Sequence, residues 1–171
     1  MPGSAAGATL QLRSPFPSRV APMSSLRFRP LLWLLAVLLA GCSIPRWPVN
    51  APVISPYGAR REPGLFPRLH EGVDLDVPMG TPVKAMKEGR VRFAGERGGW
   101  GKVVILDHSG RVTSVYAHLS RVDVRTGERV RGQQVVGLSG ASGNARSPHL
   151  HFEVWIRERP EDPVPLLGGK P

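Results

Sequence analysis

The sequence predicts an all-β fold: a single domain of mainly antiparallel sheets, sandwich-like or barrel-like, with little helix. From residue 55 to residue 167, short alternating or apolar runs follow one another, and glycine turns separate them. The same region has no long helical hydrophobic period. A region of the length of residues 55–167 can bury one modest core, so one domain is expected.

Seven segments have the short apolar or alternating pattern of strands. In chain order they are Gly72–Val77, Pro82–Ala85, Gly89–Ala94, Lys102–Asp107, Val112–His118, Gln134–Ser139 and Leu150–Ile156. The turns between them are expected where glycine tolerates a positive φ. These turns are Glu88-Gly89, Gly98-Gly99, Ser109-Gly110 and Gly140–Gly143.

The first 41 residues have the parts of a secretory signal. Two arginines precede a ten-residue apolar run at 31–40, which is shorter than the roughly 20 residues of a membrane-spanning helix. Residues 1–22 carry no acidic residue and no periodic pattern, which makes Met23 an alternative initiator. The protein is therefore expected to be exported.

Cys42 is the only cysteine of the chain and follows Leu39-Ala40-Gly41, a pattern that resembles a bacterial lipobox. A lone thiol in an exported protein cannot form an internal disulfide. Lipidation of Cys42 explains its presence, and a chance cysteine behind an ordinary signal peptide is the alternative. Acyl chains, at about 0.8 kcal/mol per buried CH2, would hold the domain at a membrane. Ser43 gives no obvious inner-membrane retention signal, so the periplasmic face of the outer membrane is expected.

Pro45, Pro48 and Pro52, with Pro56 just beyond them, stand among small and polar residues and predict a tether over 42–54, and residues 168–171 form a short tail. Without the four arginines of the first 41 residues, the formal charge falls from +10 to +6. A basic exported domain suits an anionic wall or membrane surface, although a solvated basic face explains the charge more simply. Export argues against nucleic acid as a partner.

Four of the five histidines and one carboxylate gather in three short clusters: His70 with Asp74, then His118, then His149 with His151. A zinc hydrolase needs a few imidazole or carboxylate ligands, an open position for water and nearby groups that move protons. Any one of these histidines taken singly is more simply structural. Together, the clusters predict a metal site with acid/base groups.

Strand parity orients some of these side chains. His149 and His151 are two residues apart, so both are expected on one face while Leu150 and Phe152 face the core. The four-residue spacing of the first cluster would suit a helix. The glycine and the alternation that follow indicate a loop entering a strand instead.

The same parity places His118 on one face with Ser114 and Tyr116, and Val115 and Ala117 on the other. His118 can join the other histidines only if its strand lies close to theirs. Sequence alone does not establish that proximity.

Seven segments follow one another in a recognisable order and spacing: Ser55–Arg60, His70–Asp74, Gly80–Val83, Gly99–Lys102, Tyr116–Leu119, Val130–Gly137 and Ser147–Glu153. These motifs resemble those of the lysostaphin/LytM-type zinc metallopeptidases, which cut peptide bonds in peptidoglycan. The resemblance covers residues 55–167, nearly the whole of the predicted mature chain.

Carried over residue by residue, the resemblance implies that His70, Asp74 and His151 bind one Zn2+ ion. It implies that His118 and His149 are the catalytic pair, which positions or deprotonates the zinc-bound water and stabilises the tetrahedral intermediate. Three protein ligands would leave a position for water, as this chemistry requires.

Other polar residues have less definite expectations. His108, beside a turn, is expected to be structural. Asp76 and Glu153 share the parity of ligand residues, so each either supports an imidazole or is solvated. Trp100 and Lys102 stand where the family commonly has tyrosine and asparagine, which leaves substrate preference open.

The leading hypothesis is therefore a membrane-anchored zinc endopeptidase that hydrolyses peptide cross-links of peptidoglycan. A lipoprotein signal favours D-alanyl-diaminopimelate cross-links over polyglycine bridges. One alternative is a non-catalytic LytM-like protein that binds or activates another wall hydrolase, although such relatives typically lack a ligand and this chain lacks none. A structural lipoprotein that links membrane to wall is the other.

Overall fold

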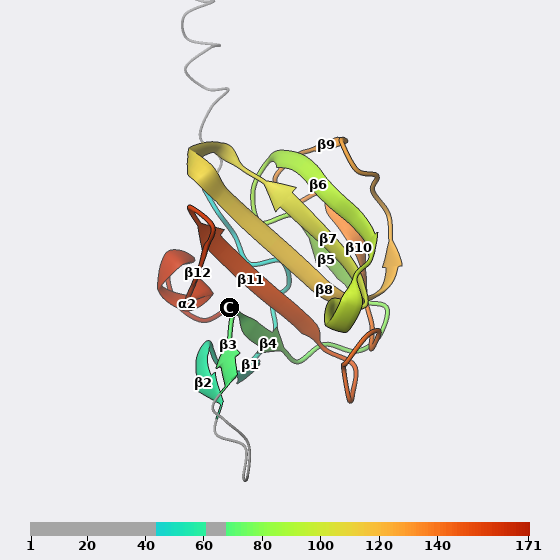
Figure 1. Ribbon diagram of the computed structural model, residues 1–171, viewed down its shortest axis with the longest axis vertical. Coiled ribbons are helices and arrows are strands. Elements are labelled where there is room, and N and C mark those ends of the chain that lie inside the picture. The colour runs from blue at the N-terminus through green and yellow to red at the C-terminus, as the bar shows by residue number, and fades with distance from the viewer. Residues whose placement is uncertain (1–43, 61–67) are drawn as a thin grey trace, which may run out of the picture. The chain divides into compact units, whose positions relative to one another are not determined.

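The computed structural model describes residues 44–60 and 68–171, which form a domain of antiparallel strands (Figure 1). The strands are β1 (Val53–Ser55), β2 (Gly58–Arg60), β3 (Arg68–His70), β4 (Val73–Leu75), β5 (Pro82–Lys84), β6 (Gly89–Glu96), β7 (Lys102–Asp107), β8 (Val112–Val122), β9 (Arg129–Val130), β10 (Val135–Ser139), β11 (Leu150–Ile156) and β12 (Arg159–Glu161). The helical elements are the 3-10 turns η1 (Gly98–Trp100) and η2 (Ser109–Arg111) and the short helix α2 (Pro163–Leu166). The all-β prediction is confirmed, and each of the seven predicted strands is present. The strands Lys102–Asp107 and Leu150–Ile156 have the predicted bounds, and the other five are shifted by one to four residues at one or both ends.

One large sheet follows the order β1-β4-β11-β8-β7-β6-β9. The strand β10 pairs with both β8 and β5, the strand β12 pairs with β11, and β2 and β3 form a separate ribbon. The long strands β8 and β11 run side by side through the middle of the sheet (Figure 1). Histidines from three distant parts of the sequence lie on or beside these central strands.

The two faces of β11 differ in what they bury. Leu150, Phe152 and Val154 belong to the main apolar core, as strand parity predicts for the first two. On the opposite face, a smaller apolar cluster joins β7 and β8 and includes the partly buried Trp155 and Trp100. Because alternate residues of a strand face opposite ways, His151 and Glu153 lie on the side of this smaller cluster.

The alternation of β8 breaks near its middle. Tyr116 and Leu119 both belong to the main core although they are three residues apart, whereas Val115 and Ala117 pack in the smaller cluster. A regular strand would direct residues three apart to opposite faces. An extra residue must therefore lie between them.

The pairing of β8 with β7 shows where the extra residue of β8 lies. Lys102 is opposite Leu119 and Val104 is opposite Tyr116, so two steps on β7 match three on β8. Within that bulge, His118 has φ = 61°, the left-handed conformation that non-glycine residues rarely adopt. The prediction that His118 shares a face with Ser114 and Tyr116 is wrong, because the bulge turns His118 to the other face.

Much of the predicted 42–54 tether packs against the domain. The Trp47 ring lies 6.1 Å from that of Phe152, and Val49 and Ala51 are buried in the main core. Strand β1 then pairs with β4. An apolar residue at every second position lets this proline-rich segment bury one side, so from Trp47 onward it does not behave as a free tether.

The tail predicted at 168–171 also contacts this segment, since Trp47 Nε1 donates to the Gly169 carbonyl at 2.9 Å. The predicted signal sequence of residues 1–41 and Cys42, the predicted site of lipidation, lie outside the described residues. Within residues 44–60 and 68–171, no helix has the length and apolar character needed to cross a membrane.

Candidate metal centre and catalytic site

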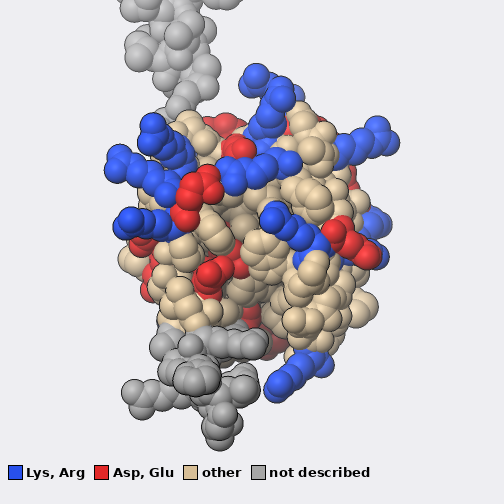
Figure 2. Space-filling view, viewed as in Figure 1, with Lys and Arg blue, Asp and Glu red and all other residues tan. Residues whose placement is uncertain are grey.

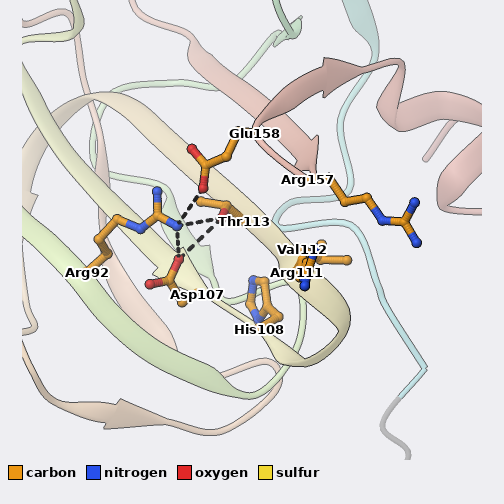
Figure 3. A pocket seen from close by; sticks show the side chains of 8 residues that line it. All are labelled: Arg92, Asp107, His108, Arg111, Val112, Thr113, Arg157 and Glu158. Atoms are coloured by element: carbon orange, nitrogen blue, oxygen red, sulfur yellow. Dashed lines mark hydrogen bonds and ion pairs between the residues drawn. The ribbon is translucent and has the colours of Figure 1, made fainter.

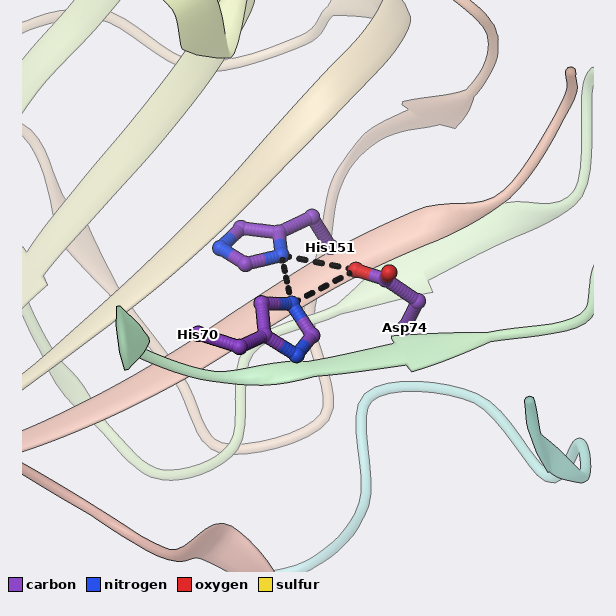
Figure 4. A group of neighbouring side chains, drawn as sticks. All are labelled: His70, Asp74 and His151. Atoms are coloured by element: carbon purple, nitrogen blue, oxygen red, sulfur yellow. Dashed lines mark hydrogen bonds and ion pairs between the residues drawn. The ribbon is translucent and has the colours of Figure 1, made fainter. Parts of the chain in front are cut away.

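Three side chains with metal-binding atoms, one each from β3, β4 and β11, converge at one point (Figure 4). His70 Nε2 is 3.1 Å from Asp74 Oδ1, His151 Nδ1 is 2.8 Å from the same oxygen, and the two nitrogens are 3.1 Å apart. All three residues are buried. These are the residues that the sequence predicts as metal ligands, and the fold brings them together.

Backbone pairing explains the convergence. Asp74 and His151 are direct partners in the antiparallel pair β4–β11, so their side chains share one face. Gly72 forms the turn that leads from His70 into β4. A Cβ at this position would collide with the carbonyl of Phe152, so only glycine allows β3 and β4 to approach β11 this closely.

In His70 and His151, the ring nitrogen that faces away from the centre makes a hydrogen bond, and this bond determines which nitrogen is free to bind a metal. His70 Nδ1 lies 2.7 Å from the carbonyl oxygen of Pro56, which can only accept, so Nδ1 is the protonated nitrogen. His151 Nε2 lies 2.8 Å from Glu153 Oε1, which likewise accepts. The two remaining nitrogens, His70 Nε2 and His151 Nδ1, therefore turn toward Asp74 with the geometry of ligands.

The centre stabilises positive charge. Burial would lower the pKa of His151, but its hydrogen bonds with Asp74 and Glu153 outweigh burial and raise the pKa to about 9. Burial would raise the pKa of Asp74, but hydrogen bonds from His151 and His70 and their charges hold it well below its usual range. A metal cation bound here would supply the positive charge that the carboxylates of Asp74 and Glu153 stabilise.

The donor chemistry distinguishes among cations. Two imidazoles and one carboxylate are ligands typical of zinc, whereas calcium and magnesium prefer oxygen ligands alone. Catalytic zinc sites commonly use three protein ligands and keep a further position open. The His70, Asp74 and His151 side chains therefore fit one zinc ion.

His118 and His149 lie beside this centre. Their ring centroids are 4.8 Å apart, and His149 Nε2 is 3.8 Å from Asp74 Oδ1. Each Nδ1 faces a backbone carbonyl: that of Ser142 for His118, at 2.9 Å, and that of Ser147 for His149, at 2.8 Å. Since a carbonyl requires a donor, each ring carries its proton on Nδ1 and keeps a lone pair on Nε2.

The buried imidazole of His118 is neutral. Its ring centroid lies 5.7 Å from that of His151. Burial, the largest effect, lowers the pKa of His118 to about 4, so the ring is uncharged at neutral pH. Its left-handed backbone is a strained conformation, which proteins retain most often at functional sites.

The loop that orients His118 is itself tied to the turn around η1. The backbone N–H of Lys102 donates to Ser142 Oγ, and the backbone N–H of Asn144 donates to the carbonyl of Gly99, both at 2.9 Å. Ser142, which accepts from His118, is thereby fixed from two sides. The orientation of the His118 ring, and hence its position beside His149, depends on these contacts.

Strand parity left open whether Glu153 and Asp76 support an imidazole or are solvated, and the structure gives a different answer for each. Asp76 is exposed, whereas Glu153 is 1% exposed and accepts hydrogen bonds from His151, Trp100 and Trp155. The two indole donors were not foreseen from the sequence. Their contact with Glu153 depends on strand pairing and on the turn around η1.

His108 lies apart from this centre, near the start of β8, beside a cavity whose walls include Arg92 and Asp107 (Figure 3). Its Nδ1 is 2.7 Å from the carbonyl of Glu88 and its Nε2 is 2.8 Å from Ser114 Oγ. Both ring nitrogens are bonded within the fold. This agrees with the structural role expected for His108.

An antiparallel β domain with a His-Asp-His donor set and two further histidines beside it has the organisation of a metallopeptidase centre. Residues 68–163 match Peptidase family M23. The chain belongs to this family, in agreement with the resemblance seen in its motifs.

Individual relatives support the same placement. The chain is 42% identical over 120 residues to the DD-carboxypeptidase/endopeptidase Mpg of Neisseria meningitidis, a match that covers 70% of this chain and 28% of the relative. It superimposes on the catalytic domain of lysostaphin from Staphylococcus simulans with a TM-score of 0.63 and 34% identity, covering 69% of this chain and 92% of that one. For a zinc containing peptidase from Vibrio cholerae the TM-score is 0.67 and the identity 29%, with 76% and 41% covered. The chain thus spans less than a third of the length of the curated relatives it matches.

Proposed function

We propose that this protein is a zinc-dependent endopeptidase that hydrolyses peptide cross-links of peptidoglycan. The observation that carries the proposal is the meeting of two sets of side chains at one point: a buried donor set for zinc, and two histidines whose Nε2 lone pairs are available beside it. Relatives named as lysostaphin and as the peptidoglycan DD-endopeptidase ShyB support the substrate class.

In this proposal His70, Asp74 and His151 hold the ion. Bound zinc supplies Lewis-acid charge to an oxygen of water or of the scissile peptide. The two ligand imidazoles are kept in place by outward hydrogen bonds, from His70 to Pro56 and from His151 to Glu153. The protein therefore presents its donor atoms without reorganising them when the ion binds.

His118 and His149 handle the protons. Each has Nδ1–H bonded to a carbonyl, so Nε2 is the atom that takes a proton from the attacking water. Once protonated at Nε2, an imidazole becomes a donor. It can then hydrogen-bond the developing oxyanion and pass its proton to the leaving amine nitrogen. Burial keeps His118 neutral, and therefore able to accept, before the reaction begins.

We further propose that lipidation of Cys42 holds the domain at the periplasmic face of the outer membrane. The segment that follows Cys42 lies on the main-core side of the sheet, where Trp47 packs against Phe152. His151 extends from the opposite face of β11. Residues 47–51, which follow the proposed anchor, thus pack away from the face of β11 that carries His151.

The charged surface is compatible with an anionic envelope. Lys and Arg side chains gather over the upper half of the view in Figure 2, where β8 begins and β11 ends. Arg92, Arg111 and Arg157 line the cavity shown in Figure 3, together with Asp107 and Glu158. A basic surface of this kind favours association with an anionic wall or membrane.

The test is digestion of purified sacculi by the purified, zinc-loaded protein, with the released muropeptides identified by mass spectrometry. Sacculi with D-alanyl-diaminopimelate cross-links are expected to be solubilised, and sacculi with polyglycine bridges are expected to resist. If a protein that holds zinc released no muropeptides from either substrate, yet stimulated a wall amidase, the non-catalytic alternative would replace this proposal.

A further inference from the structure

A buried carboxylate lies directly behind the metal centre. Glu153 is 1% exposed and sits on the face of β11 that carries His151 and Trp155. Its surroundings are apolar, because this face adjoins the smaller core cluster. A carboxylate buried in such a place is costly unless each of its oxygens accepts hydrogen bonds.

Three N–H groups satisfy this carboxylate. Oε1 accepts from His151 Nε2 at 2.8 Å and from Trp100 Nε1 at 3.0 Å, and Oε2 accepts from Trp155 Nε1 at 2.6 Å. An indole N–H can donate but cannot accept. The two tryptophans therefore orient both oxygens, and Oε1 is left facing the outer nitrogen of His151.

We propose that Glu153 is a positioning residue for zinc binding, which fixes the ring orientation and the tautomer of His151 and is itself held by the Trp100 and Trp155 indoles. The inference rests on the proposed function in one respect, that His151 is a ligand. With Nε2 as donor to Glu153, the lone pair of His151 is confined to Nδ1, the atom that faces His70 and Asp74.

Trp100 extends the arrangement to the second histidine pair. It belongs to η1, and the adjoining Gly99 accepts from the backbone of Asn144 in the loop that contains Ser142. The carbonyl of Ser142 accepts from His118. Glu153 is thus linked through Trp100 to the turn that supports His118 as well as to a metal ligand. Through its hydrogen bond to Glu153, Trp100 couples the orientation of His151 to the turn that supports His118.

Outer partners of ligand histidines typically contribute 10- to 100-fold in metal affinity. The test is therefore the zinc dissociation constant of the whole protein, measured by competition with a chromophoric chelator. Glu153→Gln preserves size but loses the charge and one acceptor. We expect it to bind zinc about 10- to 100-fold more weakly than the parent.

Single and double tryptophan variants probe the support of Glu153 without altering it. Trp100→Phe and Trp155→Phe each remove one indole donor, and the double variant is expected to weaken zinc binding by about 10-fold. Trp47→Phe is the matched control, because its indole donates to Gly169 and its ring packs against Phe152, on the face of β11 opposite Glu153. Zinc affinity in this control should equal that of the parent.

A spectroscopic measurement separates positioning from general destabilisation. In the zinc-loaded parent, 15N spectra of the imidazoles should show His151 protonated at Nε2 with a hydrogen-bonded proton shifted downfield, and this signal should move upfield in Glu153→Gln. Parent-like zinc affinity in Glu153→Gln, or in the double tryptophan variant if Glu153→Gln does not fold, would overturn the proposal. Zinc binding is measured without peptidoglycan, so failure to cleave sacculi would count only against the proposed function.

Discussion

The imidazole of His118 meets that of His149 edge to face, with ring centroids 4.8 Å apart and an interplanar angle of 62°. The first ring comes from a bulge in β8, and the second comes from the bridge that joins Gly140 to His149 just before β11. Neither residue occupies a regular strand position. Their contact therefore depends on irregular backbone held in place by the surrounding sheet.

We expect His118→Ala and His149→Ala to retain zinc and to lose turnover. Each substitution removes an Nε2 that accepts and returns a proton, a contribution typically worth about 10²- to 10⁴-fold in rate. Muropeptide release and bound zinc should be measured on the same samples. Sacculus digestion at the parent rate by both variants would show that neither histidine is catalytic.

Substitution of a ligand should have the opposite effect on metal content. Asp74→Ala, His70→Ala and His151→Ala each remove one of three donors, so elemental analysis should find less than a tenth of the parent's zinc after dialysis against a weak chelator, on the order of the loss expected for incomplete sites. Asp76→Ala is the control, since this carboxylate is exposed. Full zinc occupancy in Asp74→Ala would refute the assignment.

The bulge predicts an unusual order of stabilities at His118. Because φ is 61° there, glycine relieves strain that alanine retains, and His118→Gly should be more stable than His118→Ala by about 1 kcal/mol. At the neighbouring Ala117, whose φ is not positive, Ala117→Gly should instead destabilise by about 0.5–1 kcal/mol. Urea unfolding of the metal-free proteins measures both. Equal stabilities of the two His118 variants would argue against the bulge.

His108 should make stability depend on pH. Burial, the largest effect, lowers the pKa of His108 below its ordinary 6.5, while its hydrogen bond to Glu88 opposes this. The unfolded chain therefore binds the proton first as pH falls. His108 stabilises the fold fully above about pH 6.5, and this contribution decreases as the pH falls below that value.

The variant His108→Gln, which has no such titration, should lose less stability between pH 7.5 and pH 5.5. The measurement is the difference in urea midpoint between metal-free parent and metal-free variant, so that contributions of the other histidines cancel. An identical decrease in both proteins would contradict a lowered pKa at His108.

Cys42→Ala tests the anchor. In a bacterial host, the parent should incorporate radiolabelled palmitate and fractionate with the outer membrane, and the variant should do neither, because Cys42 is the proposed attachment point of the acyl chains that provide membrane affinity. Sacculus digestion by the purified variant should be unaffected. Membrane fractionation of Cys42→Ala equal to that of the parent would exclude lipidation as the cause of attachment.

Several features could be predicted from sequence because they depend on local periodicity. The strand segments follow from short apolar or alternating runs, and the shared orientation of His149 and His151 is expected from a spacing of two residues. The residue types of the donor set, two imidazoles and a carboxylate, indicate zinc without any structure. The core position of Leu150 and Phe152 follows from the same alternation.

Other features depend on contacts between distant residues, which only the tertiary structure decided. The register of β4 against β11 sets Asp74 opposite His151, and the bulge in β8 turns His118 out of the parity of Tyr116. Burial of Glu153 likewise required two tryptophans from different elements. A period of two describes which face a side chain takes within one strand. Strand neighbours, bulges and buried polar contacts are selected by packing across the sheet, which no local pattern contains.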